Sequence, residues 1–548
     1  MVPFYKLILS ESYQQYLKFI RQILVKTLTM ERRSFLLNIS GIVGGVSTLP
    51  VVYPNVKDIS IDPKNISLQN ISRDEGMNRI GTPITIMPVL LYNLLERKEG
   101  ETWREWGGLR NSEDVNKEIL RINKELKELK LNADFKTEFL PLFEVNTDMS
   151  ATEAVNTECD VILLFAAGTA GNYVYDKTWI NLLIHSGKHI IVFLRHKSGP
   201  TYLWYEIIHP TLLRQQSDKF VLKNLSIEDV VVDDYNKVLV RLRALYGLKN
   251  IQNTKILAIN GIGSWGGHLD KVKNAINNLW HLGVIPIGND ELISLVKEMH
   301  KDDSILKQAH NEVENFTRQD SIISINTKKE FLINTFVLYY ALKKLMEKYE
   351  AEGVTINGCM GIGKSAQTTP CLAFSLINDE GLLAFCESDF NVIPSGILLR
   401  HIAGKPVFLN DPTLPNEGIT TCAHCHSPRR MNGKDLEPTH IYTHCESDFG
   451  AAPKVEFRKG QMITNIIPDF NQNRWMGFSG TIIDHPFYAI CRSQFDCTID
   501  GDWEKLVREM RGFHWMTCYG DYLKEMDYVT RKVGIQFENI SNFTSRKF

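Results

Sequence analysis

The chain has 548 residues, of which 43% are hydrophobic and 23% are charged, and its formal net charge is −2. This composition is typical of a globular protein with roughly three to four domains. No basic stripe with interleaved aromatic residues indicates nucleic-acid binding, and no run of about 18 apolar residues predicts a transmembrane span.

The first segment, residues 1–75, is predicted to be an N-terminal extension that ends in a linker rich in Pro, Asn, Ser and Asp. Within it, MERRSFLLN begins at Met30 and carries the pair Arg32-Arg33. This string is similar to a twin-arginine export signal, which would place the protein in the periplasm if the signal is used and in the cytoplasm otherwise. An amphipathic N-terminal arm is the alternative interpretation.

Residues 76–250 alternate between apolar runs and amphipathic stretches, as in a domain with a parallel sheet. TPITIMPVLLY, CDVILLFAAG and KHIIVFLRH read as buried strands, and EDVNKEILRINKELKELKLN reads as an exposed helix with apolar residues at spacings of three and four.

The same alternation continues over residues 251–402, with strands in TKILAING, VIPIG and VTING and a long helix from Lys329. Over residues 403–548, turn residues become dense and short β-type runs such as HIYTHCES, KVEFRKGQMITNIIP and PFYAICRSQFDCTI dominate. The predicted fold is therefore α/β: two Rossmann-like domains with parallel sheets, followed by a β-rich α+β C-terminal domain.

Two strings have the form of nucleotide-binding motifs. Gly358 to Ser365 reads G-x-x-x-x-G-K-S, but Pro370 lies where the helix of a P-loop should continue, so a loop without ATP is favoured. Gly261 to Gly266 reads G-x-G-x-x-G, but Trp265 is bulky where a pyrophosphate should approach the backbone. A glycine-rich turn is the favoured interpretation of this second string.

Nine of the ten cysteines lie between Cys359 and Cys518. A disulfide framework is typical of small secreted domains, so free or buried thiols are expected in a chain of this length. Cys422-x-x-Cys425, with histidines nearby, leaves structural zinc as an alternative that would need four nitrogen or sulfur ligands close to Cys422.

Several strings in the last third carry a family resemblance. They are C-E-S-D at 386–389, G-K-P-V-F-L-N-D at 404–411, TCAHCHSPRRM at 421–431, THCESDFGAA at 443–452 and GFHWMTCYG at 512–520. Together they resemble the L-fucose isomerase/L-arabinose isomerase family over roughly residues 355 to 535.

The resemblance implies an aldose–ketose isomerase with Glu387 and Asp411 as metal ligands and acid/base groups and His514 as the third ligand. Two carboxylates and an imidazole suit Mn²⁺, or another divalent cation such as Mg²⁺, which would polarise the sugar oxygens during proton transfer through an ene-diol. It also implies a monosaccharide substrate, a homo-oligomer, and a site between the second α/β domain and the β-rich domain. The residues expected to line the sugar pocket are Lys364, His424, Arg429, Arg430, His444 and Glu446.

The alternative function is an exported carbohydrate-binding protein that keeps the fold without catalysis. The isomerase requires Glu387, Asp411 and His514 to converge within reach of one metal ion, whereas the binding protein does not. A P-loop protein would require a helix that opens at Lys364.

Overall fold

The computed structural model describes residues 81–541, with gaps at 95, 103–107, 169–178, 203–207, 209–212 and 214–224. The described residues belong to one compact unit. The predicted export signal and linker lie outside the described residues.

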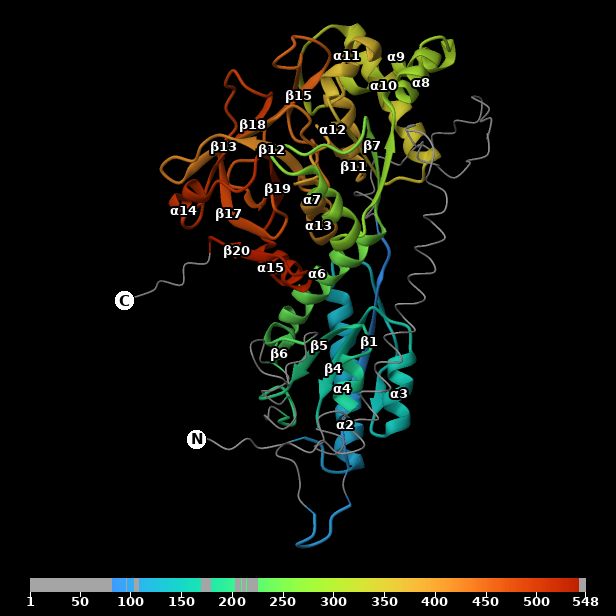
Figure 1. The fold of residues 1–548 in the computed structure, drawn as a ribbon, viewed down its shortest axis with the longest axis vertical. Helices are drawn as coiled ribbons and strands as arrows, with labels where there is room; N and C mark the ends of the chain where they lie inside the picture. The colour runs from blue at the N-terminus through green and yellow to red at the C-terminus, as the bar shows by residue number, and fades with distance from the viewer. Residues whose placement is uncertain are drawn as a thin grey trace, which may run out of the picture. The chain divides into compact units, whose positions relative to one another are not determined.

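The first parallel sheet has the order β2-β1-β4-β5-β6, with β3 also paired to β1. Its strands are β1 (Ile84–Leu91), β2 (Thr137–Phe139), β3 (Phe143–Val145), β4 (Val161–Ala166), β5 (His189–Leu194) and β6 (Val230–Val232). Every residue of β4 is buried, as expected for a strand covered on both faces. Helices α2 (Ser112–Asn132), α3 (Asp148–Asn156), α4 (Trp179–Ile184) and α6 (Tyr235–Asn253) belong to the same region (Figure 1).

The second parallel sheet has the order β11-β10-β7-β8, with strands β7 (Lys255–Ile259), β8 (Gly283–Ile287), β10 (Gly353–Ile356) and β11 (Leu383–Phe385). Its helices are α7 (Leu269–Asn274), α8 (Asn289–Met299), α9 (Asp303–Thr317), α10 (Lys329–Lys348), α11 (Gly363–Ala366), α12 (Cys371–Asp379) and α13 (Ile393–Ala403). After β7, α7 continues into a π-helical segment at Ala275–Leu279. Strands β7 and β10 end beside each other, so their following loops share one edge of the sheet.

The C-terminal part forms a mainly antiparallel sheet with the order β16-β19-β12-β13-β18-β17-β20. Its strands are β12 (Phe408–Pro412), β13 (Ile419–His424), β16 (Met462–Pro468), β17 (Arg474–Asp484), β18 (Ser493–Thr498), β19 (Trp515–Tyr519) and β20 (Gln536–Asn539). Because β16 also pairs with β17, the strands other than β20 close into a ring. Phe408, Phe478 and Phe495, all fully buried, belong to its core.

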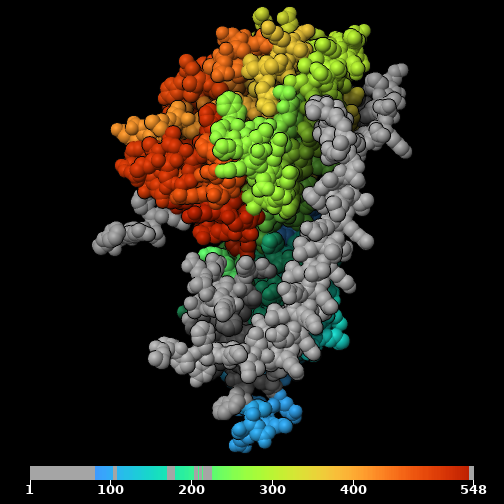
Figure 2. Space-filling view, in the orientation of Figure 1, coloured from blue at the N-terminus to red at the C-terminus, as the bar shows by residue number. Residues whose placement is uncertain are grey.

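A smaller sheet links the region of the second parallel sheet to the C-terminal part of the chain. β9 (Ile322–Asn326) pairs in parallel with β14 (Thr439–Tyr442), which pairs in antiparallel with β15 (Ala452–Val455). Figure 2 accordingly shows the green and yellow residues of the second sheet directly against the orange and red C-terminal residues. The two regions therefore pack against each other, and we call the boundary between the second parallel sheet and the C-terminal ring the seam.

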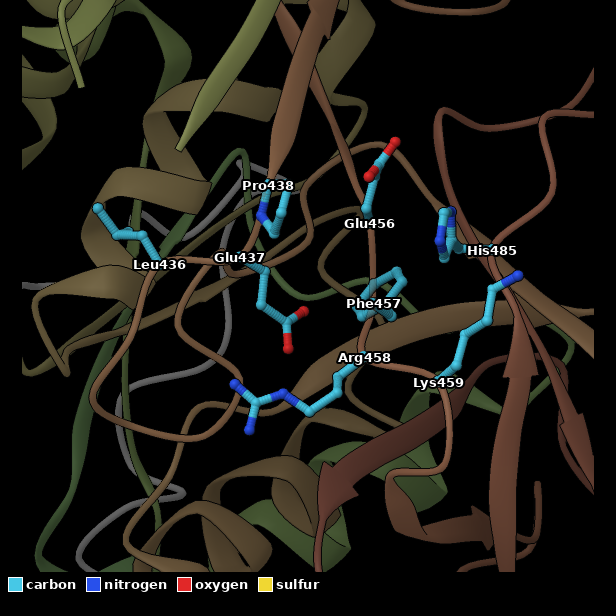
Figure 3. A pocket seen from close by; sticks show the side chains of 8 residues that line it. All are labelled: Leu436, Glu437, Pro438, Glu456, Phe457, Arg458, Lys459 and His485. Atoms are coloured by element: carbon cyan, nitrogen blue, oxygen red, sulfur yellow. The ribbon is translucent and has the colours of Figure 1, made fainter. Parts of the chain in front are cut away.

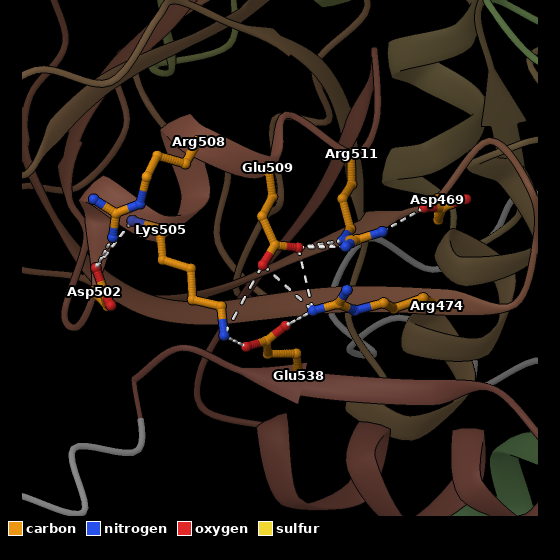
Figure 4. A network of polar contacts seen from close by, with 8 residues as sticks. All are labelled: Asp469, Arg474, Asp502, Lys505, Arg508, Glu509, Arg511 and Glu538. Atoms are coloured by element: carbon orange, nitrogen blue, oxygen red, sulfur yellow. Dashed lines mark hydrogen bonds and ion pairs between the residues drawn. The ribbon is translucent and has the colours of Figure 1, made fainter. Parts of the chain in front are cut away.

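Ion pairs bind the end of the chain to the ring. Arg474 on β17 contacts Glu538 on β20 and Glu509 at the end of α14 (Trp503–Glu509), and Arg511 bridges Glu509 to Asp469 (Figure 4). Below them, α15 (Leu523–Lys532) packs against α6. Opposite charges alternate throughout this group of side chains.

The prediction of two parallel sheets followed by a β-rich part is confirmed at the level of a mixed α/β fold. The Rossmann-like assignment of the two parallel units and the domain boundaries stay predictions. Among the described helices, none combines the length and apolarity needed to cross a bilayer.

The P-loop hypothesis fails on local structure. The helix that opens at Gly363 ends after one turn, because Gln367 takes a left-handed conformation with φ of 54°. The chain becomes helical again only at Cys371, with Pro370 as the N-cap of α12. This stretch is therefore a looped connection with no continuous helix behind it.

Candidate functional site

Three segments bring acidic and histidine side chains to the seam between the second parallel sheet and the closed ring. Glu387 follows the carboxyl end of β11, the edge at which α/β sheets bind ligands. Asp411 lies on β12, and His514 directly precedes β19. Because Asn410 pairs with Trp515 across β12 and β19, Asp411 and His514 are neighbours.

These side chains converge with His424, the last residue of β13. The Nε2 atom of His514 lies 3.2 Å from Asp411 Oδ1 and 3.5 Å from Glu387 Oε2. The Nε2 atom of His424 lies 3.8 Å from Glu387 Oε1 and 4.0 Å from Asp411 Oδ2. We call Glu387, Asp411, His424 and His514 the carboxylate–imidazole centre. Three of the four had been expected to converge on a metal ion, and the structure brings them together.

The loop that carries Glu387 is tightly bent. Glu387 and Ser388 have φ values of 63° and 53°, a left-handed conformation that costs energy outside glycine. The glycine string at 261–266 supports this bend, because Gly263 N–H donates to the Ser388 carbonyl and Ser388 Oγ donates to the Gly261 carbonyl. A Cβ at Gly263 would lie 2.8 Å from the Ser388 carbonyl oxygen, so glycine is required there. Ser388 thus occupies the glycine-rich backbone that would bind the pyrophosphate in a dinucleotide-binding motif.

Asp389 orients His514 from behind. One carboxylate oxygen, Oδ2, accepts a hydrogen bond of 2.7 Å from His514 Nδ1. The other oxygen, Oδ1, accepts from the Trp265 and Asn391 backbone N–H groups and from the Asn391 side-chain amide. No role for Asp389 was predicted from the sequence, although it lies two positions after Glu387 in the same C-E-S-D string.

The centre carries an excess of negative charge. Although burial opposes ionisation, the hydrogen bond to Asp389 and the nearby carboxylate of Glu387 raise the pKa of His514 to about 9. Against the same burial, contact with His514 lowers the pKa of Glu387. The imidazoles of His514 and His424 are 0% and 3% exposed, whereas the Glu387 and Asp411 side chains are 28% and 39% exposed. Access to the centre is therefore from the side of the carboxylates.

The donor set fits a divalent cation. His514 Nε2 and Asp411 Oδ1 are buried without a hydrogen-bond partner among the described residues. Glu387, His424 and His514 each place a ligand atom within 4.8 Å of the others, and so do Cys386, His424 and His426. Carboxylate oxygens with imidazole favour Mn²⁺ or Mg²⁺, whereas the group with a thiol favours a softer metal.

The arginines and the lysine expected in the pocket do not join the centre. Arg429 is buried and its guanidinium is paired with Asp379 at 2.7 Å, while Arg430 donates to the Lys434 carbonyl. A buried carboxylate on α12 requires a cation, which explains why Arg429 points there. Lys364 is exposed on α11, without an ion pair in the described part of the chain.

His444 and Glu446 lie on the loop after β14 and also do not contact the centre. His444 is buried, hydrogen-bonds to Ser447, and its pKa is raised, against the effect of burial, by contact with the Cys425 thiol. Glu446 is exposed. Of the six expected pocket residues, the structure thus places His424 alone in the centre.

All ten cysteines are free thiols. Cys422 packs with Cys497 in the core of the ring, whereas Cys425 packs with Cys371 in a separate cluster. Within the described residues, no metal-ligand group includes Cys422. The zinc alternative is therefore without its four ligands.

A separate cavity of about 300 Å³ lies at the β14–β15 sheet. In Figure 3, the Glu437 side chain points into it toward Arg458. Burial raises the pKa of Glu437 to about 7, and Tyr519 donates to both of its oxygens at 2.8 and 3.0 Å. None of the sequence-predicted site residues lines this cavity, whose walls are Leu436, Glu437, Pro438, Glu456, Phe457, Arg458, Lys459 and His485.

Comparison of the whole chain with protein-family models and with curated proteins finds no match.

Proposed function

We propose that this protein is a metal-dependent aldose–ketose isomerase that moves a proton between C1 and C2 of a monosaccharide through an ene-diol. The observation that carries the proposal is the convergence of Glu387 and Asp411 on the Nε2 atom of His514, at 3.5 and 3.2 Å. Such a group combines metal-ligating atoms with two bases at one accessible opening.

The metal ligands in this proposal are Glu387, Asp411 and His514. The hydrogen bond from His514 Nδ1 to Asp389 leaves Nε2 directed at the two carboxylates, where a bound cation would replace the Nε2 proton. A bound Mn²⁺ or Mg²⁺ would polarise the carbonyl and lower the pKa of the adjacent hydroxyl. Sugar oxygens bound at this site would lie close to Glu387 and Asp411, which also act as the two bases.

The carboxylates would divide the proton transfers. One takes the proton from C2 of the aldose and returns it to C1, while the other carries the hydroxyl proton from O2 to O1. Glu387 comes from the loop after β11 and Asp411 from β12, so they approach the centre from different elements. Two bases on different elements suit a substrate that must be contacted at both carbon and oxygen.

The test is NMR of a panel of aldoses with the protein and Mn²⁺ in D₂O. The expected result is ketose formation, or deuterium entry at C2, which Glu387→Gln abolishes. Glu437→Gln is the matched control, because it makes the same substitution at a buried glutamate that lies in the separate cavity. Sugar binding without deuterium exchange across the panel would contradict catalysis and favour the carbohydrate-binding alternative.

A further inference from the structure

The two imidazoles of the carboxylate–imidazole centre have opposite hydrogen bonds on their Nδ1 atoms. The Nδ1 atom of His514 lies 2.7 Å from a carboxylate oxygen of Asp389. The Nδ1 atom of His424 instead accepts a hydrogen bond of 2.9 Å from the backbone N–H of Cys425. Both Nε2 atoms face Glu387 and Asp411.

These partners assign the ring protons. An ionised carboxylate only accepts, so Nδ1 of His514 keeps its proton, and Nε2 is the nitrogen that would give up its proton to a metal ion. A backbone N–H only donates, so Nδ1 of His424 offers its lone pair and the proton of the neutral ring is on Nε2. The Nδ1 atom of His426 also lies 2.9 Å from His424 Nδ1, and with the lone pair of His424 facing it, His426 would have to be the donor that shares this lone pair with Cys425.

The proton on His424 Nε2 has no acceptor in the described structure. The nearest carboxylate oxygens, at 3.8 and 4.0 Å, are beyond hydrogen-bond distance. His424 is 3% exposed and its Nε2 atom is buried without a partner. Because an unpaired buried donor is unfavourable, this N–H is placed for a ligand that brings an oxygen atom.

We infer that His424 is a hydrogen-bond donor to a substrate oxygen and is not a metal ligand. This inference rests on the proposed function, in which negative charge develops on the oxygens at C1 and C2 as the ene-diol forms. A fixed N–H beside that oxygen stabilises the charge without transferring a proton. His424 is thus a further catalytic residue of the same site.

Proximity alone would favour a different role, because His424 lies within 4.8 Å of ligand atoms in both candidate metal groups. Binding a metal through Nε2 would move the proton of the neutral ring to Nδ1. That proton would then face the Cys425 N–H across 2.9 Å, so that two donors would oppose each other. The hydrogen bonds therefore separate His424 from His514, although both point at the same carboxylates.

The first experiment measures Mn²⁺ binding by electron paramagnetic resonance with the full chain and the variants His424→Gln and His514→Gln. We expect His424→Gln to keep the wild-type dissociation constant within about twofold, and His514→Gln to weaken binding by about 100-fold or more. Turnover of the aldose found in the D₂O panel should fall about 10²- to 10³-fold in His424→Gln. Equal loss of Mn²⁺ binding in both variants would overturn the inference.

The second experiment needs neither turnover nor a variant that folds. Long-range ¹H–¹⁵N NMR of the wild-type protein with ¹⁵N-labelled histidine reports the tautomer of each imidazole in the metal-free state. We expect His424 as the Nε2–H tautomer, and finding its proton on Nδ1 would overturn the inference. If no aldose reacts while His424 has the expected tautomer and Mn²⁺ binds without it, the proposed function fails and the assignment of His424 as a non-ligand stands.

Discussion

Two regions of this molecule concentrate charge in opposite ways. In the ion-pair network around Arg474, each carboxylate meets a cation, so that Glu538 lies against Arg474 and Asp469 against Arg511 (Figure 4). In the carboxylate–imidazole centre, Glu387 and Asp411 instead approach the same nitrogen of His514.

The two groups of charges have different roles in the molecule. A network of alternating charges is complete within the chain and fastens β17, β20 and α14 to one another. A group of converging carboxylates with unpartnered buried atoms is incomplete, because the positive charge that would balance it must come from a ligand. The following predictions test whether a charged side chain is balanced within the chain or needs a ligand to balance it.

The largest effect is expected at Asp411. Asp411→Asn removes a metal ligand and a base, so aldose turnover should fall about 10³-fold or more. The unfolding temperature of the metal-free variant should stay close to that of the wild type, because the lost repulsion between the two carboxylates offsets the lost contact with His514. Kinetics and thermal unfolding measure the two effects, with the exposed Asp484→Asn as control. A large loss of stability with turnover intact would place Asp411 among the structural charges.

Arg429 should behave in the reverse way. Arg429→Met leaves the buried Asp379 without its cation, which should destabilise the protein by about 3–5 kcal/mol while Mn²⁺ affinity stays unchanged. Thermal unfolding and Mn²⁺ titration measure these effects. Arg430→Met is the matched control, because its guanidinium donates to a backbone carbonyl and forms no direct ion pair among the described residues. A variant that unfolds like the wild type but no longer binds sugar would restore the pocket role expected from the sequence.

Glu437 extends the comparison to a buried carboxylate whose partner is a neutral hydroxyl. Its native pKa of about 7 lies above the value in an unfolded chain, so between about pH 4.5 and 7 the unfolded state has released a proton that the native state retains. Wild-type stability therefore falls across this window and changes no further above it. Glu437→Gln, which cannot ionise, should gain roughly 3 kcal/mol over the wild type between pH 4.5 and pH 8.

The measurement is the difference in unfolding temperature between Glu437→Gln and the wild type, followed from pH 4.5 to 8. Glu456→Gln is the control, because contact with His440 lowers the pKa of Glu456 despite burial, and its stabilising effect is lost as pH falls. A difference for Glu437→Gln that does not change with pH would mean that Glu437 titrates as in an unfolded chain.

The sequence predicted the local elements well because their signals are local. The apolar runs of β4 and β5 and the spacing of apolar residues in α2 mark buried strands and an amphipathic helix without reference to other segments. The pairing of β9 with β14 joins residues more than 100 positions apart, and neither strand carries a mark of its partner. The pairing of these two strands across the seam could therefore not be predicted from the sequence.

The same limit applied to the candidate site. The spacing of Glu387, Asp411 and His514 was recognised through a family resemblance, and it selected residues that do converge. Arg429 was assigned to the pocket because its partner Asp379, 50 positions earlier, gives no sign of pairing in the sequence. Asp389 was overlooked because orienting an imidazole depends on atomic contacts that a motif does not contain.

The smallest effect is expected at Asp389, which is fully paired within the chain and also contacts His514 of the carboxylate–imidazole centre. Its Oδ1 atom accepts three hydrogen bonds from fixed donors, so in Asp389→Asn the amide oxygen should take that position and the amide nitrogen should face His514 Nδ1. His514 would then have to accept through Nδ1, so the proton of the neutral ring would lie on Nε2, the nitrogen that a metal ion needs. Mn²⁺ affinity should fall about 10- to 100-fold with little change in stability, and long-range ¹H–¹⁵N NMR recorded above pH 9, where wild-type His514 is neutral, should show the tautomer of His514 reversed. Wild-type Mn²⁺ affinity with a reversed tautomer would mean that His514 is not a ligand, whereas an unchanged tautomer would mean that Asp389 does not set the orientation of the ring.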